Sequence, residues 1–160
     1  MTERPLGRMI LMCGLPGSGK TTQARRLERE RGAVRLTPDE WLDELGVDMV
    51  DEQFRDRLEW RFRRLGQHLV TAGVDVVLDF GFWVRAERDA MRRWCREHGV
   101  EVELHVLDPP FEVLVARVTA REVAGATGLV PLTRADLESY RTLFEPVDAD
   151  EWGDFDAPLG

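Results

Sequence analysis

Eight consecutive residues near the N-terminus combine the residue types that hold a chain of phosphates. The sequence Gly-Leu-Pro-Gly-Ser-Gly-Lys-Thr over 14–21 fits the pattern of a glycine, four free positions and then Gly-Lys-Ser/Thr. Glycines let successive backbone N–H groups converge on phosphate oxygens. Lys20 can reach the outer phosphates, and the Thr21 hydroxyl can ligate Mg²⁺. The segment therefore predicts binding of a nucleoside triphosphate, with these contacts: Gly14, Pro16, Gly17, Ser18, Gly19, Lys20, Thr21 and Thr22.

Two carboxylates further along the chain could complete a phosphoryl-transfer site. Asp79 ends an apolar run and is placed to hold Mg²⁺, directly or through water. The alternative for Asp79 is a turn residue, since Asp-x-Gly is common in turns. Asp39 follows another short apolar run, where a carboxylate could orient an acceptor hydroxyl and accept its proton. The alternative for Asp39 is stabilisation of a helix N-terminus.

The elements that would position these residues alternate between strand and helix patterns. Short apolar runs typical of buried parallel strands occur at 9–13, 33–36, 74–79 and 100–107. Helical patterns occupy 21–31, 52–72, 86–98 and 111–123, and a last helix follows Thr133. Thr37-Pro38-Asp39-Glu40 predicts a further helix start, with Thr37 as N-cap and Glu40 closing a capping box. The alternation predicts an α/β three-layer sandwich around a parallel sheet of four to five strands, the P-loop nucleoside-triphosphate hydrolase/kinase fold.

The length and charge of the chain limit the number of domains and the classes of function that it can have. The 160 residues predict a single domain over 1–160, with an acidic tail at 145–160 that is irregular or partly ordered. The net charge of −8 argues against a large nucleic-acid footprint. Asparagine does not occur, which excludes the Asn-Lys-x-Asp element by which GTPases read guanine.

The cysteines and the hydropathy pattern predict a location. Cys13 falls in an expected strand and Cys95 in an expected helix, which is typical of reduced thiols in a cytoplasmic protein. No apolar run approaches the roughly 18 residues of a membrane span, and the first residues lack a signal-peptide core. We therefore expect a cytoplasmic protein without a membrane partner. The oligomeric state stays open.

These landmarks resemble the small P-loop kinases, a group of AAA-type ATP-binding kinases. The group includes the 5′-hydroxyl kinase domain of phage polynucleotide kinase, the zeta toxins and chloramphenicol phosphotransferase. The resemblance runs from about Met9 to Phe144 and rests on the 14–22 loop, Asp39, Asp79, the segment 85–88, and Arg117 with Arg121 before a variable loop. It implies ATP as phosphate donor and Mg²⁺ as metal.

The resemblance also implies roles for individual residues. Asp39 would be the general base, and Arg121 would reach onto the transferring phosphate. Arg117 would be the weaker partner, which contacts phosphate or holds its helix. With Lys20, the expected catalytic set is Lys20, Asp39 and Arg121, and the expected metal contacts are Thr21 and Asp79.

The acceptor side of this chain departs from the polynucleotide kinases. Phage polynucleotide kinase has an arginine three residues past its base, where this chain has Leu42, and this weakens the prediction of a nucleic-acid acceptor. The side chains predicted to contact the acceptor are Asp39, Trp41, Trp83 and Arg85, and the aromatic ones suit a planar or apolar small molecule.

The leading hypothesis is therefore an ATP-dependent kinase that acts on a hydroxyl of an unidentified small molecule. A polynucleotide 5′-hydroxyl kinase is the first alternative. A nucleotide-binding regulatory module without an acceptor is an alternative of another class. A toxin that phosphorylates a nucleotide sugar is less favoured.

Overall fold

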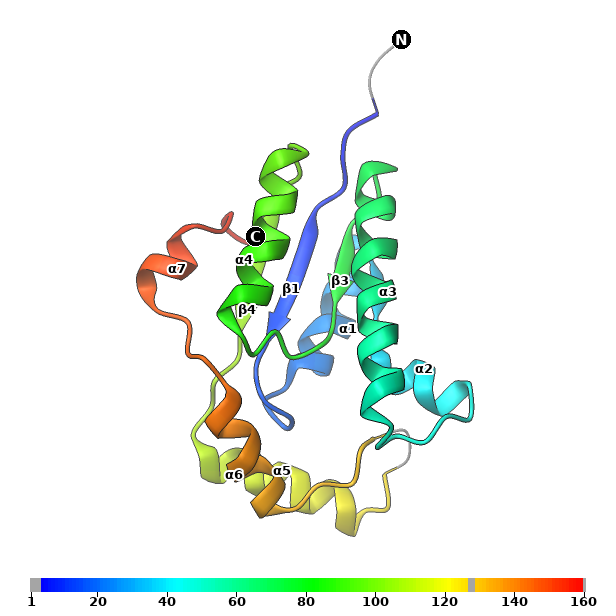
Figure 1. Ribbon diagram of the computed structural model, residues 1–160, viewed down its shortest axis with the longest axis vertical. Helices are drawn as coiled ribbons and strands as arrows, with labels where there is room; N and C mark the ends of the chain where they lie inside the picture. The colour runs from blue at the N-terminus through cyan, green and yellow to red at the C-terminus, as the bar shows by residue number, and fades with distance from the viewer. Residues whose placement is uncertain (1–3, 127–128, 160) are drawn as a thin grey trace.

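A parallel four-stranded sheet organises the chain in the computed structural model, which describes residues 4–126 and 129–159. The strands are β1 (Met9–Cys13), β2 (Val34–Leu36), β3 (Val76–Leu78) and β4 (Val102–Val106), in the order β2-β3-β1-β4. β1 pairs with β3 and β4, and β2 pairs with β3 at the edge of the sheet. Figure 1 shows β1 near the centre of the sheet.

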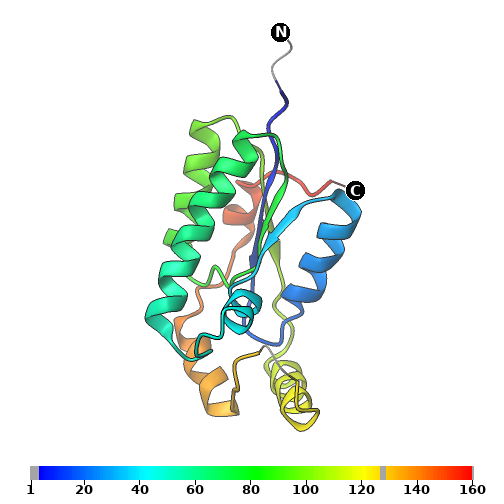
Figure 2. The ribbon, with the colours of Figure 1, turned by 90° about the vertical axis from the view of Figure 1, so that its right-hand side faces the viewer.

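Helices cover both faces of this sheet. α1 (Lys20–Arg31) lies on one face, and α3 (Glu52–Thr71) and α4 (Arg85–Glu97) lie on the other, as Figure 2 shows. The remaining helices are α2 (Pro38–Glu44), α5 (Phe111–Val123), α6 (Arg134–Leu143) and α7 (Ala149–Gly153). The predicted α/β sandwich is confirmed, with a sheet at the small end of the expected range. Of the helices described, none is long and apolar enough to cross a membrane.

The buried residues of β1 divide between the two sides because successive side chains of a strand point to opposite faces. Met9 and Leu11 pack with the cores of α3 and α4, whereas Ile10 and Met12 pack with α1. β1 is apolar along its whole length for this reason, as expected of a strand covered on both faces. Cys13 and Cys95 are both buried free thiols, as predicted.

All four strands end at one edge, and this edge positions the site. The chain leaves β1 through α1 toward β2 on one side, while β4 lies on the other side of β1. In open α/β sheets, ligands bind where the chain direction diverges in this way. α5 and α6 gather below this edge in Figure 1, and α2 lies beside it.

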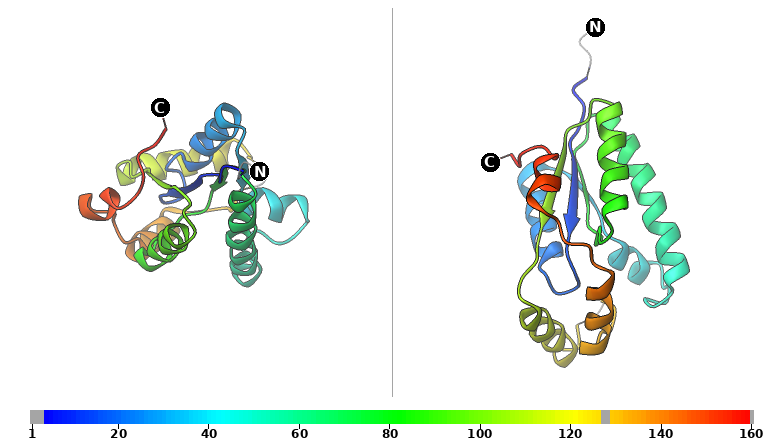
Figure 3. Two further views of the ribbon diagram at one scale, coloured as in Figure 1. Left: turned by 90° about the horizontal axis from the view of Figure 1, so that it is seen from above. Right: turned by 60° about the vertical axis from the view of Figure 1, so that its left-hand side comes forward.

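The acidic tail, expected to be irregular or partly ordered, contains α7 and packs along β4 (Figure 3). The Asp156 N–H donates to the Val102 carbonyl at 2.9 Å, and the Asp156 carboxylate accepts from the Val102 N–H at 2.7 Å. Trp152 Nε1 donates to the Leu104 carbonyl at 3.0 Å. Phe155 is buried in the core beside α4.

Candidate active site

The loop between β1 and α1 has the geometry of a phosphate cradle. A Cβ at Gly14 would lie 2.5 Å from the Leu107 carbonyl oxygen, so only glycine fits there. Gly17 and Gly19 have φ angles of 81° and 96°, a region that favours glycine. α1 begins directly after Gly19, so its unpaired N–H groups and positive dipole end face the loop.

Asp79, immediately after β3, receives two hydroxyl donors. Thr21 Oγ1 and Thr37 Oγ1 each donate to Asp79 Oδ2 at 3.0 Å. The other carboxylate oxygen, Oδ1, is buried and has no hydrogen-bond partner among the described residues. Burial raises the pKa of Asp79, while Lys20 and the two threonine hydroxyls favour its charged form. A buried, half-satisfied carboxylate requires an explanation.

Mg²⁺ would satisfy that orphaned oxygen. Mg²⁺ is usually held by one or two protein side chains together with phosphates and water. The described residues contain no cluster of three or more His, Cys, Asp or Glu side chains suited to hold a metal on their own. The Asp79 carboxylate and the Thr21 hydroxyl therefore fit a metal that shares its coordination sphere with a phosphate.

The prediction of a capping box at Thr37 is wrong. The Thr37 side chain makes no cap hydrogen bond. Its hydroxyl donates to Asp79, and its oxygen accepts from Arg35 Nη1 instead of from an N–H group of α2. Glu40 forms ion pairs with Arg25 at 2.7 Å and with Arg35 at 2.8 Å. Thr37 thus contacts a predicted metal ligand, whereas its sequence pattern predicted only a helix cap.

Asp39, in the first turn of α2, is held by an arginine from α3. Arg55 Nη2 lies 2.7 Å from Asp39 Oδ1. The sequence alone does not indicate this ion pair, because sixteen positions separate Asp39 from Arg55. The pattern that could have marked Arg55 is its place on a charged face of α3. This face is formed by Glu52, Arg55, Asp56 and Glu59, which are spaced three or four residues apart.

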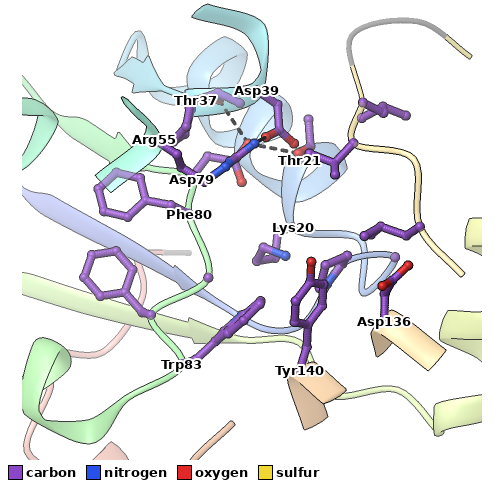
Figure 4. Close-up of a pocket in the computed structure, with 18 of the residues that line it drawn as sticks. Lys20, Thr21, Thr37, Asp39, Arg55, Asp79, Phe80, Trp83, Asp136 and Tyr140 are labelled. Carbon is purple, nitrogen blue, oxygen red and sulfur yellow. Dashed lines mark hydrogen bonds and ion pairs between the residues drawn. The ribbon is translucent and has the colours of Figure 1, made fainter. Parts of the chain in front are cut away.

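The residues predicted to be catalytic surround one cavity of about 1200 Å³, shown in Figure 4. Lys20, Thr21, Asp39, Asp79 and Arg121 all line it. Lys20 Nζ donates to the Leu15 carbonyl at 3.0 Å. Burial lowers the pKa of Lys20, the carboxylates of Asp79 and Asp39 oppose this shift, and Arg121 adds to it.

α5 supplies the two arginines beside the phosphate loop. Arg117 Nη1 donates to the Gly17 carbonyl at 3.1 Å, so this residue supports the loop. Arg121, one turn further along, lines the cavity. The two arginines share a face of α5, as their spacing of four predicts.

Two residues expected on the acceptor side lie outside the cavity. Trp41 is 40% exposed and packs edge-on against Phe62, with ring centroids 4.9 Å apart. Arg85 lies 3.6 Å from both Asp89 and Asp148 instead of facing the cavity. Trp83, the third of the expected side chains besides Asp39, does line the cavity.

A fully buried arginine shapes the wall that carries Trp83. Arg88 donates to the carbonyls of Phe82 at 2.8 Å and Trp83 at 3.1 Å, and pairs with Glu151 of α7 at 2.5 Å. Phe82 has a φ of 45°, a strained value for a non-glycine residue. Trp83 Nε1 in turn donates to the Gly14 carbonyl at 3.0 Å. The tail therefore helps to hold this wall in place, which the sequence pattern did not predict.

Comparison with known proteins places the chain in a family. Residues 9–147 match the family described as AAA domain. No curated protein matches the chain in sequence.

Several solved structures share the fold. A sugar kinase from Janibacter sp. is 25% identical over 91% of this chain and 82% of its own, with a TM-score of 0.62. A chain of the Pnkp1/Rnl/Hen1 RNA repair complex is 23% identical, with a TM-score of 0.71, over 97% of this chain and 48% of that longer one. The Mycobacterium tuberculosis APS kinase CysC, solved with AMPPNP and APS, is 20% identical over 81% of this chain and 79% of its own, with a TM-score of 0.58.

Proposed function

Because the chain belongs to the AAA domain family of small P-loop kinases, we propose that it is a phosphotransferase. It moves the γ-phosphate of ATP to a hydroxyl group of a small molecule. One observation carries the proposal: Asp39 shares a cavity with Lys20 and Arg121. Triphosphate binding alone does not require a carboxylate from α2 facing that cavity, whereas transfer to a hydroxyl does.

The residues divide the chemistry between donor and acceptor. The backbone N–H groups of the 14–21 loop and the start of α1 bind the β- and γ-phosphates. Lys20 and Arg121 stabilise the negative charge of the transferring phosphoryl group. Asp39 orients the acceptor hydroxyl and accepts its proton as the new O–P bond forms and ADP leaves. Arg55 positions the Asp39 carboxylate through their ion pair.

The metal contacts are Asp79 and Thr21. When bound there, Mg²⁺ would neutralise charge on the donor phosphates. Thr37 donates a hydrogen bond to Asp79 Oδ2, which leaves Oδ1, the oxygen without a partner among the described residues, for the metal.

The experiment measures ADP formation across a panel of hydroxyl compounds. We expect Asp39→Asn to lower acceptor-dependent turnover by about a hundredfold or more while ATP still binds. Asp43→Asn is the matched control, because Asp43 is an exposed carboxylate on the same helix. Lys20→Ala should weaken ATP binding itself.

The outcomes separate the candidate functions. An Asp39→Asn variant that retains all nucleotide-dependent behaviour, with no acceptor found, would favour a regulatory nucleotide-binding module. A 5′-hydroxyl oligonucleotide belongs in the panel because a chain of an RNA repair complex shares the fold. Phosphate transfer to that oligonucleotide alone would replace the small-molecule acceptor by a polynucleotide.

A further inference from the structure

The acceptor side of the cavity is lined by carboxylates from several elements. They come from α3, α4, α6 and the start of the tail: Glu52, Asp56, Glu59, Glu87, Asp136 and Glu145. The basic residues that line the cavity in the described chain are Lys20, Arg117 and Arg121, on the phosphate side, and Arg55. Arg55 is already paired with Asp39.

Only part of this negative charge is compensated. Arg63 lies 3.8 Å from Glu59 and 3.2 Å from Glu87. Glu52 and Asp56 have no ion-pair partner within the described ranges. They stand four apart on α3, where two like charges destabilise a helix. The helix dipole favours Glu52 in the first turn of α3, but it does not favour Asp56 one turn further on, and a cationic ligand would offset the charge of both.

Two aromatic rings line the same cavity as these carboxylates, which is an independent feature of the acceptor side. Trp83 and Tyr140 line the cavity with ring centroids 5.0 Å apart. Figure 4 shows both rings across Lys20 from Asp39 and Arg55. Burial raises the pKa of Tyr140, and the negative charges of Asp136 and then Glu52 raise it further, so carboxylates of α6 and α3 both act at this ring.

Carboxylates beside aromatic faces are the chemistry that recognises an ammonium group. The negative face of a tryptophan or tyrosine ring attracts a cation within about 6 Å of its centroid. The cavity's carboxylates repel an anionic acceptor, since like charges at close range oppose binding. The cavity of about 1200 Å³ has room for a triphosphate together with a small acceptor.

We propose that the acceptor is a small hydroxyl compound that also carries a protonated amine. Its ammonium group lies between the α3 carboxylates Glu52 and Asp56 and the Trp83–Tyr140 pair, and its hydroxyl meets Asp39. This inference rests on the proposed phosphotransferase function and names the substrate class. The amine is not altered in the reaction; the hydroxyl oxygen forms the bond to phosphorus, and ADP leaves.

Matched sets of acceptors test the charge preference. Each set shares one scaffold and differs in charge: glucosamine, glucose and glucuronate form one set, and serinol, glycerol and glycerate form another. We expect kcat/KM for the amine to exceed that of its neutral and anionic analogues by at least about tenfold. Added salt should raise KM for the amine, because salt screens exposed charges.

The variants Glu52→Gln and Asp56→Asn test the assigned residues. Combined, they should raise KM for the amine by about tenfold with little change in kcat, so that the preference over the neutral analogue falls. Glu44→Gln with Asp43→Asn is the control pair, because both are exposed acids of α2 outside the cavity. The control pair should leave the preference unchanged.

The outcomes distinguish this inference from the function on which it rests. Phosphorylation of neutral or anionic analogues as efficiently as amines, or a preference that survives Glu52→Gln with Asp56→Asn, overturns the inference and leaves the phosphotransferase standing. Failure to phosphorylate any compound, by a protein that still binds ATP, overturns the proposed function itself.

Discussion

Glu59 illustrates how a single residue of the site bears on stability. It lies on α3 among Arg63, Arg55 and Asp56, and Glu87 of α4 faces it. Burial raises its pKa to about 7, and the nearby arginines only partly offset this shift. A carboxyl group in this position binds a proton more tightly in the folded than in the unfolded protein.

The sign of the pH effect follows from that difference. Between about pH 4.5 and pH 7 the folded state holds a proton that the unfolded state has lost, so unfolding releases it. Stability therefore falls as pH rises through this window, by a few kcal/mol at most (about 3). Below about pH 4.5 the Glu59 carboxyl is protonated in both states, so stability no longer depends on pH through this residue.

We predict that Glu59→Gln raises the free energy of unfolding at pH 8 but not at pH 4. The amide cannot ionise and so avoids the cost of a buried charge. Urea denaturation across this pH range measures the effect, with Glu97→Gln, an exposed acid of α4, as control. An equal stability change at both pH values would show that Glu59 is not the group responsible.

At the scale of an element, two arginines of α5 make different contacts, although their sequence spacing does not distinguish their roles. Both lie on one face, four residues apart. Arg117 holds the Gly17 carbonyl, whereas Arg121 faces the cavity near Lys20.

We predict that Arg121→Ala lowers kcat by about a hundredfold or more, because it removes a charge that acts on the transition state. Arg117→Ala should instead weaken ATP binding by a few fold, about 1 kcal/mol, as expected for loss of one supporting hydrogen bond. Steady-state kinetics with ATP as the varied substrate separate the two effects. Equal losses of kcat in both variants would contradict the division of roles.

α7 supports the cavity wall through a buried ion pair. Its Glu151 is buried against Arg88, which holds the strained wall of the cavity. Removing one partner of a buried ion pair leaves the other charge uncompensated.

We therefore predict that Glu151→Ala lowers the free energy of unfolding by about 3–5 kcal/mol. Asp150→Ala, at the exposed neighbouring position, should change it by less than about 0.5 kcal/mol. Denaturant-induced unfolding measures the free energy of unfolding of both variants. A Glu151→Ala protein as stable as the wild type would mean that the tail does not hold the cavity wall.

Over the whole molecule, local patterns predicted the fold and several of the residues that meet at the cavity. Apolar runs that end in Gly14, Asp39 and Asp79 place those residues at one edge, because the strands of a parallel sheet share a direction. The spacing of Arg117 and Arg121 likewise predicts one helix face.

The rest of the acceptor side, beyond Asp39 and Trp83, could not be predicted in this way because it depends on contacts between distant segments. Arg55 meets Asp39 across two helices, and Arg88 meets Glu151 across 63 residues. Trp41 and Arg85 have suitable chemistry, but packing turns them away from the cavity. Thr37 matched a capping pattern, and only the position of Asp79 shows why its hydroxyl is used elsewhere.

Phosphorus NMR tests the central claim most directly, because it separates transfer to an acceptor from hydrolysis by water. The protein is incubated with ATP, Mg²⁺ and the hydroxyl panel. We predict a new phosphate monoester resonance that grows with ADP for the wild type and the Asp43→Asn control, and is absent for Asp39→Asn. ATP loss that yields only inorganic phosphate, equal in all three proteins, would contradict the assignment of this cavity to phosphoryl transfer onto a hydroxyl acceptor.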